Sequence, residues 1–252
     1  MSEHLRLEIA GARATITLDR PEKRNMLETA DLAVLDGFLE RVERTAAARV
    51  LVVTGAGERA FSSGFAHGDV ADTDWRANPI EATINRLEAL RLPTVCALNG
   101  GAYGASADLA LACDFRIGVT GLRVALPAAR LGVMYNLSGL ARFVRRIGPG
   151  PARRLLLAGE EMDAETLLAV GYLDRLVARD ALAAETDRLA ERLAALAPRA
   201  VQGMKRALVG LARGELDRAW AEAEILACFA SDDLKEGLAA FAERRAPRFT
   251  GR

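Results

Sequence analysis

The sequence predicts an α/β fold, a layered core of strands and helices followed by a helical C-terminal region. In the first half, apolar runs of strand length alternate with stretches whose apolar residues recur at helical spacing. From Asp180 onward only helical patterns remain, at 181–197, 199–213, 215–230 and 232–245. We therefore place the core at 1–195 and the helical region at 196–252. No low-complexity linker separates them, so we expect the two parts to pack together.

The elements of the core follow one another along the chain. Two alternating strands, 5–9 and 13–19, form a hairpin that turns near Gly11. A helix at 29–46 leads to a strand at 50–54, whose uninterrupted apolar residues are typical of a strand buried on both faces. The remaining elements are a helix that ends before Pro93, a strand at 95–98, a helix at 105–112, strands at 115–119 and 123–126, a helix capped by Ser138 and ended by Gly148, a short helix after Asp163 and a strand within 173–177.

Composition and charge disfavour several classes of protein. Lys and Arg together number 34, as do Asp and Glu, so no net charge draws the chain toward nucleic acid or an anionic membrane. The sequence shows neither a signal-peptide pattern nor an apolar run of the ~20 residues that a membrane span needs. Cys96, Cys113 and Cys228 lack the spacing of a zinc site or a disulfide framework. We expect a soluble, cytoplasmic protein without a bound metal.

The arginines between Arg142 and Arg154 form the richest basic stretch of the chain. They alternate with apolar positions of predicted helices. We therefore expect them on a solvent-exposed face, with a phosphate contact as the less favoured alternative.

Two glycine-containing loops that follow predicted strands are candidate sites. Their sequences are AFSSGFAHGD at 60–69 and NGGAYGASAD at 99–108. Glycine lets a chain turn where a side chain would clash, and this frees backbone N–H groups. In the second loop these groups also lie at a predicted helix N-terminus, which favours negative charge. Two such N–H groups that converge on one oxygen would form an oxyanion hole, although glycine turns after strands are common and the pattern alone is not specific.

Five segments, taken together, resemble the crotonase (enoyl-CoA hydratase/isomerase) superfamily. They are RPEKRNML at 20–27, AFSSGFAHGDV at 60–70, ALNGGAYGASADLALACDF at 97–115, LPAARLGVMYNLSGLARFVRRIG at 126–148 and AFAERRAPRF at 240–249. They span nearly the whole chain in the family's order. The resemblance implies a spiral core of repeated ββα units whose C-terminal helices support a homotrimer or a dimer of trimers. It also implies an acyl-CoA thioester as substrate, with coenzyme A part of that substrate rather than a cofactor, and a role in fatty acid metabolism.

The resemblance also implies roles for individual residues. The N–H groups of Phe65 and Ala105 would hold the thioester enolate. Phe65 stands where relatives usually carry a small residue, so it would reshape the acyl pocket or else only fill a gap. Contacts with the substrate or its CoA portion would come from Lys23, Arg24, Asn25, Ser63, Gly64, Ala66, His67, Gly104 and Arg244.

Two departures from the family's pattern bear on the reaction. Typical hydratases use two glutamates, because water must be activated while a proton is delivered to the α-carbon. Asp108, one methylene shorter, takes the first of these positions, and Ala128, which cannot transfer a proton, takes the second. An ordinary two-carboxylate hydratase and a simple isomerase are therefore both disfavoured. Asp108 remains the candidate base or polar positioning group, the alternative being a structural carboxylate bonded to nearby backbone.

Two further stretches resemble the methylmalonyl-CoA decarboxylase branch of the superfamily, namely RLGVMYNLSGL at 130–140 and SDDLKEGLAAFAERRAPRF at 231–249. In that branch a tyrosine at the position of Tyr135 faces the acyl group, so Tyr135 is the second candidate catalytic residue, the alternative being a core tyrosine. The branch's histidine is replaced here by Phe65, and His67 lies two residues later. We expect an acyl-CoA lyase of decarboxylase-like or atypical hydratase type. The alternative is an acyl-CoA-binding relative that has lost catalysis.

Overall fold

The computed structural model describes residues 3–66, 68 and 76–252, and its larger sheet has six strands in the order β1-β2-β3-β5-β7-β10. β1 pairs with β2 in antiparallel fashion, and the other neighbours run parallel. The strands are β1 (Leu5–Ala10), β2 (Arg13–Leu18), β3 (Val50–Gly55), β5 (Thr94–Leu98), β7 (Phe115–Val119) and β10 (Arg175–Val177). All residues of β5 are buried, as are the first four of β3, which confirms that these central strands are covered on both faces.

A second sheet has four short strands in the order β4-β6-β8-β9. They are β4 (Ala60–Ser62), β6 (Gly101–Tyr103), β8 (Arg123–Ala125) and β9 (Met162–Asp163). β4, β6 and β8 each follow a strand of the larger sheet and precede a helix. The chain therefore repeats a ββα unit, with one strand in each sheet, and the predicted architecture is confirmed. β4, β6 and β9 are too short to be predicted from periodicity.

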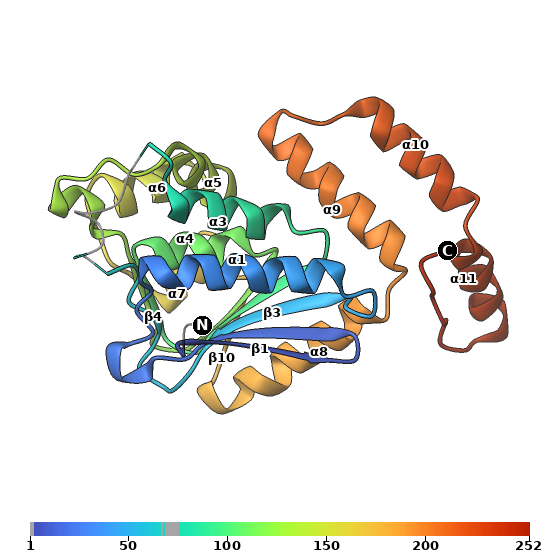
Figure 1. Cartoon of the computed structure of the whole chain (residues 1–252), viewed down its shortest axis with the longest axis horizontal. Helices are drawn as coiled ribbons and strands as arrows, with labels where there is room; N and C mark the ends of the chain where they lie inside the picture. The colour runs from blue at the N-terminus through green and yellow to red at the C-terminus, as the bar shows by residue number, and fades with distance from the viewer. Residues whose placement is uncertain (1–2, 67, 69–75) are drawn as a thin grey trace.

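Helices cover both faces of the larger sheet (Figure 1). α8 packs against β3, β5 and β7, while α1, α3, α4 and α5 contact one another in series. The helices are α1 (Thr29–Arg44), α3 (Pro79–Ala89), α4 (Ala105–Ala112), α5 (Leu137–Ile147), α6 (Pro149–Leu156), α7 (Ala164–Ala169), α8 (Leu182–Ala194), α9 (Pro198–Arg213), α10 (Arg218–Phe229) and α11 (Asp232–Glu243). None of the helices in the described part of the chain has the length and apolar character needed to cross a bilayer.

The start of α5 differs from the prediction. Asn136, not Ser138, caps this helix, because the Asn136 side-chain oxygen accepts a hydrogen bond from the Gly139 N–H at 2.7 Å. Ser138 lies in the first turn, where its hydroxyl accepts from Asn85. Gly148, at φ +79°, ends α5 as expected, but α6 begins at the next residue, with proline at its first position.

The helices α9, α10 and α11 project away from the sheets (Figure 1). α9 contacts α3 and α10, and α10 contacts α11. The expected boundary near residue 196 falls in the turn between α8 and α9. Large apolar side chains are exposed on these helices, namely Met204, Leu208, Leu211, Ile225, Leu226, Phe229, Leu234, Leu238 and Phe241. Exposed apolar area of this extent marks an interaction surface, and the trimerisation role of 196–252 stays a prediction.

Candidate active site

The loop after β4 is held beside the start of the chain's first long helix by two backbone hydrogen bonds. The Leu27 N–H donates to the Gly64 carbonyl and the Ala66 N–H donates to the Leu27 carbonyl, each at 2.8 Å. Phe65 lies between these two bonded positions. Its own N–H has no acceptor among the described residues, so this donor is available to a ligand.

The second loop turns from β6 into α4 at Gly104, where φ is +56°, a conformation that favours glycine. The Gly104 N–H donates to the Ala125 carbonyl at 2.9 Å, and the Tyr103 N–H donates to the Ser106 hydroxyl at 2.9 Å. Ala105 is the first residue of α4, so its N–H has no partner within the helix. No other described residue accepts from it.

These two loops touch each other. The Ser106 hydroxyl donates to the Ser62 carbonyl at 2.8 Å. A Cβ added at Gly64 would collide with the Tyr103 carbonyl oxygen and would lie 3.7 Å from the Ala105 nitrogen. The free amides of Phe65 and Ala105 therefore belong to adjoining segments.

Asp108 lies one helical turn after Ala105 on α4 and is fully buried. Its Oδ1 accepts a hydrogen bond from Arg142 at 2.5 Å, whereas its Oδ2 is buried with no partner among the described residues. Burial raises the pKa of the Asp108 carboxyl above its usual value, although Arg142 opposes the rise. An unpartnered carboxylate oxygen is costly in a protein interior, and its position one turn from the amides makes it a candidate proton acceptor.

Tyr135 supplies a second buried polar atom, its hydroxyl oxygen, which lies beside Asp108 but forms no well-aligned hydrogen bond in the described part of the chain. Burial, followed by the neighbouring charge of Asp108, raises the pKa of Tyr135 well above its usual value. The phenol is therefore neutral at physiological pH and able to donate a proton in a hydrogen bond. The ring packs edge-on against Phe143, with centroids 6.3 Å apart.

Gly139 lies between these two side chains, which yields a testable prediction. A Cβ at this position would collide with the Tyr135 ring and lie 2.8 Å from Asp108 Oδ2. Gly139→Ala is therefore expected to lower the free energy of unfolding by about 1–3 kcal/mol and to impair catalysis, because the Tyr135 ring has to move.

Gly37→Ala on α1 is the control, because a Cβ at this position meets nothing within 4 Å. Its free energy of unfolding should rise by about 0.5–1 kcal/mol. Denaturant unfolding measures both, and equal gains would contradict the proposed contact.

The prediction that the arginines between Arg142 and Arg154 lie on a solvent-exposed face is wrong for Arg142. Arg142 is 0% exposed and not part of a solvated face, whereas Arg153 and Arg154 are exposed as expected. Arg142 is buried because Asp108 and Glu88 both form ion pairs with it. The buried residues of α5 are Gly139, Arg142, Phe143 and Ile147. Their helical spacing was the signal in the sequence that Arg142 faces inward.

The turn at Pro21–Lys23 is bound to the first loop, since the Ser63 N–H donates to the Arg24 carbonyl at 2.8 Å. Lys23 and Arg24 are exposed and available to a phosphate. Asn25 is buried instead, and its side-chain amide donates to the Ala56 and Ala60 carbonyls. Asn25 therefore fixes the turn through its own polar atoms.

The structure places one predicted contact residue, Arg244, apart from this arrangement. Arg244 is exposed at the end of α11, in the left-handed region at φ +53°, and α11 lies far from β4 in the same chain (Figure 1). His67 lies outside the described residues. Ala128 lies in the 3-10 turn Pro127–Leu131 and offers no titratable group.

Comparison with known proteins gives consistent results across the chain. The family described as Enoyl-CoA hydratase/isomerase matches residues 8–252. Short-chain-enoyl-CoA hydratase of Clostridium acetobutylicum is 30% identical over 250 residues, covering 95% of this chain and 94% of that protein. Carnitinyl-CoA dehydratase of Proteus mirabilis is 32% identical over 263 residues, covering 100% of both. The crystal structure of enoyl-CoA hydratase from Bacillus anthracis superposes with a TM-score of 0.89 at 28% identity, covering 99% of this chain and 100% of that one.

Proposed function

Because the chain belongs to the enoyl-CoA hydratase/isomerase family, we propose that it is a hydro-lyase that adds water to an enoyl-CoA, or removes it, with one carboxylate in place of two. The observation that carries this proposal is the buried, unpartnered Oδ2 of Asp108, one helical turn from the free amide of Ala105. Hydratase and dehydratase names among the relatives favour the same reaction class.

The oxyanion hole is proposed to consist of the Phe65 and Ala105 amides. When water adds to the β-carbon of an enoyl thioester, negative charge moves through the α-carbon onto the thioester oxygen. Two fixed N–H donors stabilise that charge better than mobile water does, because they are already oriented before the reaction. Their adjoining loops support this role.

Asp108 is proposed to carry the proton through the whole cycle. Its carboxylate takes a proton from water as the water oxygen bonds to the β-carbon. The resulting carboxylic acid then gives that proton to the α-carbon of the enolate, and the carboxylate is restored. Because one carboxylate both accepts and returns the proton, the reaction requires no second titratable group. The absence of a carboxylate at Ala128 is therefore compatible with hydration. Water and proton reach the substrate from the same side, so the addition is syn.

Tyr135 is proposed to orient the attacking water. Its hydroxyl is buried near Asp108 and stays neutral because its pKa is raised. It can therefore donate to the water oxygen or accept from it without changing charge.

The decarboxylase-like alternative is supported by the position of Tyr135 but faces an electrostatic obstacle. A malonyl-type substrate that used this site would bring its own carboxylate close to Asp108. Two like charges in a buried site repel each other strongly. Hydration chemistry avoids this repulsion because the reacting end of an enoyl group is uncharged.

A substrate panel distinguishes these functions. We expect crotonyl-CoA or a larger enoyl-CoA to lose its conjugated ultraviolet absorbance as water adds, with one solvent deuteron incorporated at the α-carbon in D₂O. Malonyl-CoA and methylmalonyl-CoA should release no CO₂. Specific CO₂ release would replace the hydro-lyase assignment with the decarboxylase one. Tight binding of every thioester without turnover would instead identify a relative that has lost catalysis.

Assembly as a homotrimer or a dimer of trimers is part of the same proposal. The exposed apolar residues of α9–α11 need a covering surface, and Phe241 is 88% exposed in the single chain. α11, which Arg244 follows, projects away from the sheets of its own chain (Figure 1), so the proposed contact of Arg244 with a ligand would be made to a neighbouring subunit. Sedimentation equilibrium should give a mass of three or six chains, and a monomer at micromolar concentration would contradict the assembly.

A further inference from the structure

A buried cluster of charges connects Asp108 with three other helices. Asp108 on α4 pairs with Arg142 on α5 at 2.5 Å, and the Arg142 Nε lies 3.3 Å from Glu88 on α3. Glu88 in turn pairs with Arg213 on α9. Asp108, Arg142 and Glu88 are all buried. Isolated buried charges are destabilising, so a connected set of them at a candidate active site calls for an explanation.

We propose that Arg142 is a positioning residue: it anchors one oxygen of Asp108 and turns the free Oδ2 toward the substrate. The inference rests on the proposed role of Asp108. Arg142 occupies only Oδ1, at 2.5 Å, and this leaves Oδ2 without a partner among the described residues. The Arg142 guanidinium is itself fixed, because its Nη2 donates to Asn85 at 2.7 Å. One oxygen of the carboxylate is thus an anchor and the other is free to exchange a proton.

Charges of opposite sign act on Asp108 within this cluster. Burial raises the pKa of Asp108 and so favours the protonated acid. The positive charge of Arg142 lowers this pKa, whereas the negative charge of Glu88 raises it further. Arg142 and Arg213 hold the pKa of Glu88 below its usual value despite its burial, so Glu88 is charged at neutral pH. Other titratable groups also face the cluster. They are Glu81 and Glu88 of α3, Tyr135 just before α5, Arg142, Arg145 and Arg146 of α5, Tyr172 before β10, and Arg213 of α9.

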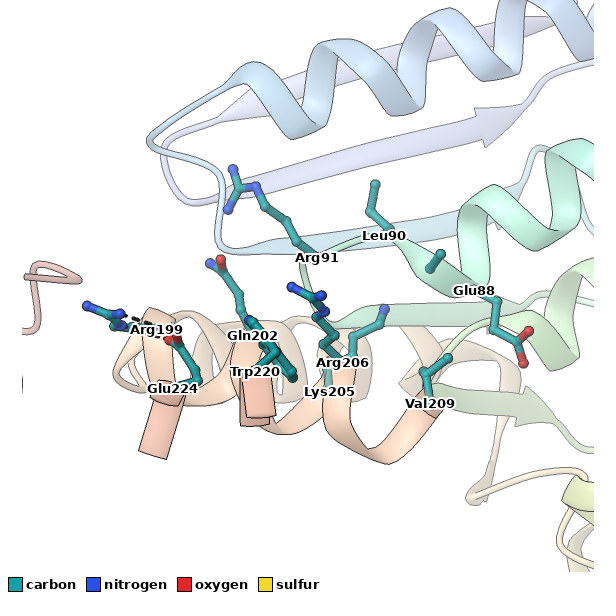
Figure 2. A pocket seen from close by; sticks show the side chains of 12 residues that line it. Glu88, Leu90, Arg91, Arg199, Gln202, Lys205, Arg206, Val209, Trp220 and Glu224 are labelled. Atoms are coloured by element: carbon teal, nitrogen blue, oxygen red, sulfur yellow. Dashed lines mark hydrogen bonds and ion pairs between the residues drawn. The ribbon is translucent and has the colours of Figure 1, made fainter. Parts of the chain in front are cut away.

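Glu88 is buried, but it lies beside a cavity. This cavity has a volume of about 440 Å³ and lies between the end of α3 and helices α9 and α10. Figure 2 shows Glu88 at one end of this cavity, with Lys205, Arg206 and Val209 of α9 nearer the middle. Glu88→Gln keeps the size of the side chain and removes a charge that acts on Asp108.

The test compares the pH dependence of kcat/KM in Arg142→Gln and Glu88→Gln. The acid limb of this profile reports the pKa of the essential base. Loss of Arg142 removes the charge that favours the carboxylate, so the limb should move to higher pH by about 1 unit or more. Loss of Glu88 removes a repelling charge, so the limb should move to lower pH. Arg142→Lys retains the charge, and we expect the limb to stay near the wild-type position while kcat falls.

Shifts of opposite sign exclude a purely structural role, because a general loosening of the site would solvate Asp108 in both variants and move both limbs to lower pH. Arg116→Gln is the matched control, since Arg116 is only 2% exposed and pairs with Asp174 rather than Asp108. Its acid limb should not move. If Arg142→Gln does not fold, Glu88→Gln and Arg142→Lys decide the question. Unmoved limbs in the folded variants would overturn the inference.

Failure of the inference can be told apart from failure of the proposed function. Asp108→Asn should abolish the acid limb, and adding Arg142→Gln to Asp108→Asn should then produce no further shift. If Asp108→Asn retains wild-type turnover, the proposed function is wrong. If Asp108→Asn loses turnover but the limbs of the Arg142 and Glu88 variants do not move, only the positioning role is wrong.

Discussion

Replacing Asp108 with asparagine is expected to lower enoyl-CoA turnover by about 10²–10⁴-fold, the contribution typical of a general acid–base group. The amide keeps the shape of the carboxylate and can still contact Arg142, but it cannot accept and return a proton. Steady-state kinetics on the substrate found in the panel should show the loss mainly in kcat.

Asp114→Asn is the control for this variant. Asp114 is the next acidic residue along the chain, and it accepts hydrogen bonds from Thr94 and pairs with Lys205 at 2.7 Å. Its replacement should cost stability and leave kcat near the wild-type value. Equal activity in the Asp108 and Asp114 variants would remove Asp108 from the mechanism.

Asp108→Asn should also change how the free energy of unfolding depends on pH. A carboxyl group whose pKa is raised in the folded state contributes stability that is present below its unfolded pKa and is lost as the pH rises through the folded pKa. The pKa of Asp108 is raised in this way, with burial as the largest cause. The ionised carboxylate is thus costly at neutral pH, and the asparagine variant should gain stability relative to wild type as pH rises. Denaturant unfolding across pH measures the difference, and the opposite slope would contradict the assignment.

Replacing Ala105 with proline is expected to lower kcat by about 10²–10³-fold, the usual effect of losing one oxyanion donor. Ala105 is the first residue of α4, a position where proline fits helical geometry and where the missing N–H has no partner within the helix. The substitution therefore removes the proposed donor with little change in the helix. Rate measurements at saturating substrate, together with thermal unfolding, separate the two effects.

Arg218→Pro provides the matched control for this substitution. Arg218 is the exposed first residue of α10, a helix remote from the two loops. Its replacement should leave kcat unchanged. A full rate in Ala105→Pro would show that the Ala105 amide does not hold the reacting oxygen.

Most of the larger sheet and its helices could be predicted because their signals are long. The uninterrupted apolar run that became β3 and the helical spacing of α1 each extend over enough residues to be specific. β4 and β6 are three residues each, shorter than any periodic pattern, so the second sheet was implied only by the resemblance. The register between the sheets depends on contacts between distant segments, which a single sequence does not contain.

The site was predictable only in part for a similar reason. Phe65 and Ala105 were proposed from the family's motifs, and their adjoining positions depend on a close approach at Gly64 that no local pattern encodes. Arg142 was assigned to a solvent-exposed face because the arginines of this stretch alternate with apolar positions of the predicted helices. Its burial follows from Asp108 and Glu88, which are 34 and 54 residues away along the chain. Asn25 was expected to contact the ligand, whereas its side chain bonds to the surrounding backbone.

The parallel pairing of β4 with β6 has a consequence for how such a protein diversifies. The two donor loops are equivalent parts of successive modules, so stacking one module on the next brings them together without any special connection. A mutation in either loop alters one module while the neighbouring module stays unchanged. Each loop can therefore change in sequence over evolutionary time without disturbing the fold of the other.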